Sequence, residues 1–170
     1  MTRLACWLLI LFPALICQAQ AERMRELYFG AAGKAGITAY YKEAVLLQTT
    51  DPLLLAYQGV AIAMYAEVVS GVGQKFEYFD KGKDLIERAA AQAPQNVEIA
   101  FLRFSVQSEV PSFLGYRSNL QDDANKVVAA LRARQVPAGD PFWSKALAFM
   151  KKSGRLNKLQ LAEINRYLTT

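Results

Sequence analysis

The sequence contains no histidine, and its two cysteines, Cys6 and Cys17, both lie within the first 21 residues. Residues 22–170 therefore cannot form a disulfide, a thiol nucleophile, a Ser-His-Asp triad or a zinc site with nitrogen and sulfur ligands. The chain also lacks a glycine-rich phosphate loop and a calcium-binding loop motif. We therefore expect no metal ion and no other cofactor, and any enzyme activity would have to use carboxylates, lysines or tyrosines.

The first part of the chain has the pattern of a secretory signal peptide, which we assign to residues 1–21. A short basic start precedes an apolar run over residues 4–16, and Ala19-Gln20-Ala21 is typical of a cleavage site. The run is shorter than the roughly 20 apolar residues that a membrane-spanning helix needs. We expect cleavage after Ala21 and export of residues 22–170 into a bacterial periplasm, with no transmembrane span in the mature chain.

Two alternatives to this cleavage are left open. A lipoprotein modified at Cys17 would also lie outside the cytoplasm, but lipid attachment favours a small residue before the cysteine, and Ile16 is bulky. The other alternative is an N-terminal anchor that is not cleaved.

Residues 22–170 have the size of one domain, and we expect a single helical domain there. Their formal net charge is +4, one less than the +5 of the whole chain, because Arg3 is removed with the signal. Five prolines, at positions 52, 94, 111, 137 and 141, stand between segments with apolar residues at helical spacing. No segment alternates apolar and polar residues as a strand does, and no Asn-Gly or Asp-Gly hairpin turn occurs. The sequence therefore predicts an all-α fold.

Eight helices are predicted after the signal peptide, at residues 22–32, 37–48, 52–69, 74–93, 97–109, 118–134, 141–153 and 157–168. Asp51-Pro52 and Asp140-Pro141 each place a side-chain acceptor before a proline at the first helical position, and Asn157 can cap the last helix. Ser118-x-x-Gln121 matches a capping box. Because the connections are short, neighbouring helices should run antiparallel and form stacked helical hairpins.

Two of these helices are predicted to lie in the core. The helix at 52–69 is apolar on nearly every side and has a stripe of small residues that lets a neighbouring helix approach closely. The members of this stripe are Ala56, Gly59, Ala63 and Ala66. The helix at 97–109 has two opposite apolar flanks, which contain Phe101 and Leu102 and indicate neighbours on both sides.

Two polar stripes separate the flanks of the helix at 97–109. One consists of Glu98 with Ser105, and the other of Arg103 with Gln107. We expect one stripe to meet solvent and the other to line a groove. In the segment that follows, we expect the large side chains of Phe113, Leu114 and Tyr116 to fold inward; in the alternative they form a binding lip beside Arg103 and Gln107.

Residues 82–98 resemble the junction between two tetratricopeptide repeats (TPRs). Gly82, Ile86, Ala89 and Pro94 match the small, large, small and proline positions that recur in such repeats. The full repeat period is not kept, because the helices at 52–69 and 97–109 begin 45 residues apart. The resemblance therefore implies a degenerate, TPR-like right-handed α-α array.

Over residues 52–128 the chain also resembles small uncharacterised exported bacterial proteins with a TPR-like helical fold. The matching motifs are Lys75-x-x-x-Phe79-x-x-Gly82, Pro94-x-Asn96-Val97-Glu98, Phe101-Leu102-Arg103-x-Ser105-Val106-Gln107 and Pro111-x-Phe113-Leu114-Gly115-Tyr116. A basic residue is expected in this pattern where Ala100 stands. The resemblance implies the fold and the export, and no enzymatic mechanism.

The first functional hypothesis is a module that binds or scaffolds a protein or peptide partner in a helical groove. Stacked hairpins present a concave face, and cations beside an amide and a tyrosine suit an extended chain or its carboxylate. The candidate partner-binding residues are Lys75, Arg103, Gln107 and Tyr116. No residue is assigned a catalytic role, and the partner and the oligomeric state are left open.

Two further hypotheses use the charged residues. A carboxylate-based enzyme acting on envelope glycan would need paired acids, for which Glu98, Asp122 and Asp123 are the candidates. Acids at 122 and 123 also suit the first turn of a helix without any catalytic role. A cluster of basic residues toward the C-terminus would give weak binding to anionic surfaces, and we expect no nucleic acid as a partner after export. Its members are Arg132, Arg134, Lys151, Lys152, Arg155 and Lys158.

Overall fold

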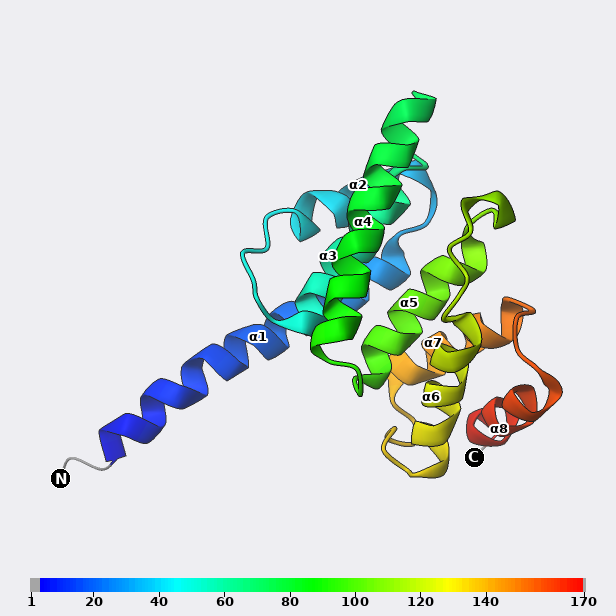
Figure 1. Cartoon of the computed structure of the whole chain (residues 1–170). Coiled ribbons are helices and arrows are strands. Elements are labelled where there is room, and N and C mark those ends of the chain that lie inside the picture. Colours follow the sequence, from blue (N-terminus) through cyan, green and yellow to red (C-terminus); the bar gives the residue numbers. More distant parts are fainter. Residues whose placement is uncertain (1–3, 170) are drawn as a thin grey trace.

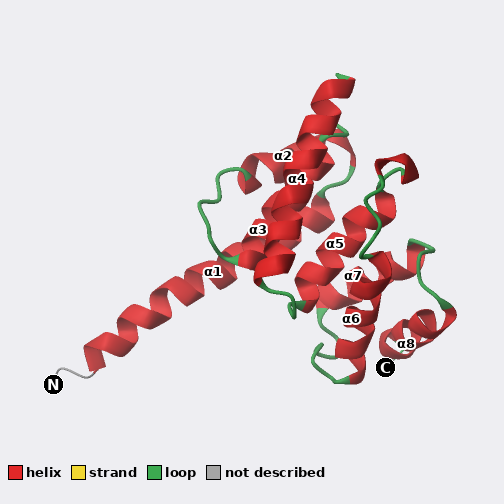
Figure 2. Ribbon diagram, in the orientation of Figure 1, coloured by secondary structure: helices red, strands yellow, loops and turns green. Residues whose placement is uncertain are grey.

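The computed structural model describes the backbone of residues 4–169 and the side chains of residues 17–169. Within this range there is no strand, and the all-α prediction is confirmed (Figures 1 and 2). The helices are α1 (Leu4–Gly30), α2 (Gly33–Ala44), α3 (Pro52–Tyr65), α4 (Val72–Gln92), α5 (Val97–Glu109), the short 3-10 helix η1 (Ser112–Leu114), α6 (Leu120–Arg132), α7 (Pro141–Lys152) and α8 (Lys158–Leu168).

The predicted signal peptide coincides with the first part of α1. Residues 1–3 and the side chains of residues 1–16 lie outside the described part of the chain, and α1 continues through the predicted cleavage position at Ala21. Figure 1 shows the beginning of α1 extending away from the other helices, whereas its later residue Met24 is buried among them. Over residues 17–169, whose side chains the structure describes, no helix is both long enough and apolar enough for a bilayer crossing.

Three predicted helix starts are confirmed. Asp51 and Asp140 each accept a backbone N–H at 3.0 Å, and each stands before a proline. Asn157 forms a reciprocal capping box with Gln160. The capping box predicted at Ser118 is wrong, because α6 begins at Leu120 and the Ser118 hydroxyl donates to the side chain of Asn119 instead.

The helix predicted at 37–48 lies four residues earlier, as α2. A glycine with a φ of 62° begins it at Gly33, and the chain leaves the helix after Ala44. The apolar residues beyond that point suggested a longer helix, but they form a loop in which Leu46 is exposed.

The hairpin of α3 and α4 is closed by two glycines. A Cβ atom added to Gly82 would lie 2.5 Å from the backbone oxygen of Gly59 and 2.5 Å from the backbone nitrogen of Ala63. The helix backbones therefore touch here, as the stripe of small residues on α3 predicts. Ile86 packs against the same place and is completely buried. We call the region of Gly59, Gly82 and Ile86 the closed half of the hairpin.

Helix α5 lies in the centre of the molecule, against α3, α4, α6 and α7 (Figure 1). Every residue from Glu98 to Ser108 is buried, and the side chains of Phe101 and Leu102 are completely enclosed. This confirms the prediction of neighbours on both flanks. The expectation that one polar stripe of α5 meets solvent is wrong, because all four residues of the two stripes are buried. Helices α6 and α7 pack against α5, and α8 packs against α6 and α7.

A candidate binding pocket beside α5

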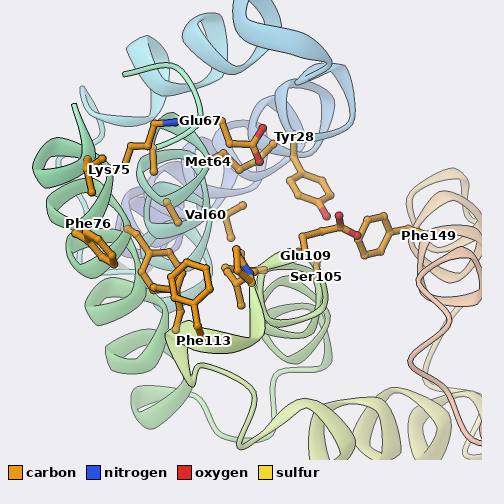
Figure 3. A pocket seen from close by; sticks show the side chains of 18 residues that line it. Tyr28, Val60, Met64, Glu67, Lys75, Phe76, Ser105, Glu109, Phe113 and Phe149 are labelled. Atoms are coloured by element: carbon orange, nitrogen blue, oxygen red, sulfur yellow. The ribbon is translucent and has the colours of Figure 1, made fainter. Parts of the chain in front are cut away.

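A pocket of about 420 Å³ lies between the α3–α4 hairpin and the end of α5 (Figure 3). This volume is within the range of about 300–1,000 Å³ that is usual for ligand sites. Most of its lining is apolar and comes from α3, α4, α5 and η1, with one residue each from α1 and α7. The apolar and aromatic lining residues include Val60, Met64, Val72, Phe76, Phe79, Val106, Val110, Phe113, Leu114 and Phe149.

The pocket exists because the beginning of α4 is not covered by α5. Figure 1 shows the first turns of α4 extending beyond the neighbouring helices. Val72 and Phe76 in these turns are 70% and 44% exposed, whereas Phe79, one turn later, is buried and lines the floor. The apolar face of α4 therefore continues from the core into the pocket.

The loop after α5 forms the opposite rim. Its residue Phe113 is 78% exposed, so the expectation that this side chain folds inward is wrong, whereas Tyr116 is buried as expected. Gly115 has a φ of 65°, a conformation that suits glycine, and it ends η1 directly after Leu114. This turn leaves Phe113 on the pocket side and sends Tyr116 to the interior. A large exposed aromatic side chain beside an apolar pocket indicates a surface that a ligand covers.

Polar groups occur at two places in the pocket. Tyr28 lies with Ser105 and Glu109 near one end. Burial raises the pKa of Tyr28 to about 12, and the charge of Glu109 adds to this rise, whereas a hydrogen bond with Ser105 opposes it. In Figure 3, Glu67 lies between Tyr28 and Lys75, and the Nζ atom of Lys75 points toward Glu67. Among the described residues, Glu67, Glu109 and Lys75 have no ion pair.

The predicted site residue Arg103 is not in this pocket. Its Nε and Nη2 atoms donate to the two carboxylate oxygens of Asp123 at 2.7 and 2.8 Å, and Nη1 donates to Glu87 at 2.8 Å. These bonds raise the pKa of Arg103, with Asp123 as the larger cause. Burial raises the pKa of the Asp123 carboxyl, and Arg103 opposes that rise. The guanidinium therefore neutralises acids inside the protein.

Gln107 and Tyr116 lie beside this network. The Tyr116 hydroxyl donates to Glu87 at 2.7 Å, and burial, followed by that bond, raises the pKa of Tyr116. Gln107 is completely enclosed; its amide makes no hydrogen bond of normal geometry among the described residues, but it lies close enough to Tyr116 to lower the pKa of the phenol. The structure thus brings three of the four predicted residues together and leaves Lys75 apart, at the pocket.

The acids of the enzyme hypothesis do not face one another across the pocket. Glu98 accepts hydrogen bonds from Arg25 at 2.7 Å and from Tyr57 at 2.5 Å, whereas Asp123 is held by Arg103. Asp122 is exposed on α6. Among the described residues, no group of three or more histidine, cysteine or acidic side chains is placed to hold a metal ion.

Sequence reasoning missed most of the pocket. Tyr28 and Phe149 come from α1 and α7, and nothing in their local sequence indicates that they meet α3 and α5. Phe113 is predicted at a binding surface only in the alternative that places a lip beside Arg103 and Gln107, and neither of those two residues lines the pocket. We found no family model that matches the chain, and no curated protein and no solved structure that is similar to it.

Proposed function

We propose that the protein is a binding module that holds an apolar segment of a partner protein or peptide in the pocket between the α3–α4 hairpin and α5. The observation that carries the proposal is the exposure of Phe113, Phe76 and Val72 around a concave apolar floor. Burial of large aromatic side chains at the centre of an interface supplies much of the binding energy in protein complexes.

The arrangement of the helices supports the same proposal. We propose that α3 with α4 and α5 with α6 are two antiparallel pairs of a TPR-like array, since α5 packs against both members of the first pair. Such arrays bind extended or helical segments along the surface between neighbouring pairs. On the pattern of residues 1–21, we propose export as well, so that the partner would be an envelope protein.

Fluorescence anisotropy with a labelled amphipathic peptide tests the proposal. The peptide has one face of leucines and neutral glutamine residues elsewhere. Phe113→Ser should weaken binding about tenfold, which corresponds to about 1.4 kcal/mol. Leu46→Ser is the matched control, because Leu46 is 77% exposed, almost as much as Phe113, and lies outside the pocket.

A lipid ligand is the competing outcome of this experiment. Neutral phospholipid vesicles should not bind in a way that depends on Phe113. If vesicles bind and the peptide does not, or if Phe113→Ser and Leu46→Ser have equal effects on peptide binding, the proposal is wrong.

A further inference from the structure

The polar end of the pocket carries negative charge from two independent sources. Glu67 and Glu109 both line the pocket, both are exposed, and neither has an ion pair among the described residues. In addition, α3 ends at Tyr65 and α5 ends at Glu109, so that the negative ends of two helix dipoles lie at this part of the pocket.

The last turns of these helices carry no basic residue of their own. At the end of α5, Arg117 donates to the backbone oxygen of the C-cap residue Val110, so this helix end already has a cation, but Arg117 does not pair with Glu109. Among the described residues, no hydrogen bond from a basic side chain reaches the end of α3.

The acids beside the two ends of α5 differ in this respect. Glu98 at its start is bound by Arg25, and Asp123 of α6 is bound by Arg103 of α5. Within residues 17–169, Asp84 and Asp122 are exposed acids without an ion pair as well, so what distinguishes Glu67 and Glu109 is their place beside an apolar pocket.

Lys75 is the cation of the pocket lining. In Figure 3 it lies beside Phe76 with its Nζ atom pointing toward Glu67, whereas Glu109 lies farther away, beside Tyr28. Lys75 also has no ion pair among the described residues. A cationic group of a ligand would therefore be attracted most strongly to the end of the pocket near Tyr28 and Glu109.

We infer that the segment bound here is amphipathic and basic at one end, with its apolar side chains on Phe76, Phe79 and Phe113 and its basic side chain against Glu67 and Glu109. This inference rests on the proposed function and adds the chemical class of the partner. A basic side chain in this place would pair with the two acids and would complement the C-terminal end of α3. A free cationic small molecule would leave most of the apolar floor uncovered, whereas a peptide segment covers it.

Three labelled peptides with the same leucine face test the inference. They carry lysine, glutamine or glutamate residues at one end. The lysine peptide should bind about fivefold tighter than the glutamine peptide at low salt, because exposed charge pairs make modest contributions to binding. The glutamate peptide should bind weakest, because its charge is repelled by the two acids. The difference should shrink in high salt. Lysines at both ends should give no further gain, because Glu67 and Glu109 are the only acids among the described residues that line the pocket.

The double variant Glu67→Gln/Glu109→Gln should reduce the ratio of lysine-peptide to glutamine-peptide affinity to about one. Its matched control is Asp84→Asn/Asp122→Asn, which changes the net charge equally at two exposed acids outside the pocket and should leave the ratio unchanged. The single variant Glu109→Gln should have an intermediate ratio.

The inference is overturned if the native protein binds the lysine and glutamine peptides equally, or if the ratio survives in the double variant. Binding of the glutamine peptide that still depends on Phe113 would then leave the proposed pocket intact and remove only the charge preference. Failure of all three peptides to bind would overturn the proposed function itself.

Discussion

In the closed half of the α3–α4 hairpin, the backbones of two helices touch at Gly59 and Gly82, and the nearby Glu87 is paired with Arg103. At the pocket, beside the other end of the same hairpin, Phe76 is exposed and Glu67 has no ion pair among the described residues. Each region thus contains a large apolar side chain and an acid, Ile86 and Glu87 in the first and Phe76 and Glu67 in the second. The difference lies in what contacts these side chains. In the closed half the contacts come from the protein itself, whereas at the pocket a partner can supply them.

The largest expected effect is on the stability that the buried charges provide. Arg103→Leu should lower the free energy of unfolding by about 3–5 kcal/mol, because it leaves Asp123 buried without its cation. Urea denaturation followed by circular dichroism measures this. Lys81→Ala is the control: Lys81 pairs with Glu77 at the surface, and its loss should leave the free energy of unfolding nearly unchanged. Equal losses in the two variants would show that the interior pair has no special role.

Two glycines on α4 distinguish the closed half from the pocket end. Gly82→Ala should destabilise the protein by about 1–3 kcal/mol, since the new Cβ would collide with the backbone of α3. Gly73→Ala, in the first turn of the same helix, meets no atom within 4 Å and should instead stabilise the protein by up to about 1 kcal/mol. Thermal denaturation of both variants checks this, and a stable Gly82→Ala protein would contradict the close approach of the helices.

A substitution in the pocket should weaken peptide binding and leave the stability of the protein nearly unchanged. Phe76→Ser should leave the free energy of unfolding within about 0.5 kcal/mol of the native value, because the side chain is exposed at the start of α4. The same variant should weaken binding of the leucine-faced peptide about tenfold. Parallel denaturation and anisotropy measurements separate the two. A large loss of stability would mean that Phe76 belongs to the core.

The smallest effect concerns Tyr28, which links the core to the polar end of the pocket. The pKa of this phenol is about 12 in the folded protein, above its ordinary value of 10.0. The resulting stabilisation is therefore fully present below pH 10 and is lost as the pH rises from 10 to about 12. Tyr28→Phe should make the fall in unfolding free energy over this interval shallower, by about 1 kcal/mol at pH 11. An unchanged slope would mean that the phenol is not buried.

Much of the fold could be predicted because its signals are local. A proline after an aspartate fixed the starts of α3 and α7, and the small residues of α3 predicted its contact with α4. The two apolar flanks of α5 predicted a central helix, since side chains on both flanks have to be buried.

The candidate site could not be predicted in the same way. The polar residues of α5 suggested a groove, but whether Arg103 faces a ligand or an acid of the protein depends on where Asp123 and Glu87 lie, and these come from other helices. Conversely, Phe113 looked like a residue that folds inward, because its sequence context says nothing of the turn at Gly115 that directs it outward. In both cases the environment of the side chain depends on residues that are distant in the sequence or on the path of the backbone, which the local pattern does not show.

The most direct test of the account is to locate a bound peptide on the protein by NMR. Amide chemical shifts are recorded while the leucine-faced glutamine peptide is added. The account predicts that the largest changes lie at residues 63–67, 72–79 and 105–114, which surround the pocket. The account would be contradicted if no change occurred at the pocket and the changes centred instead on Arg103, Asp123 and Glu87, or on the lysine- and arginine-containing segment 151–158.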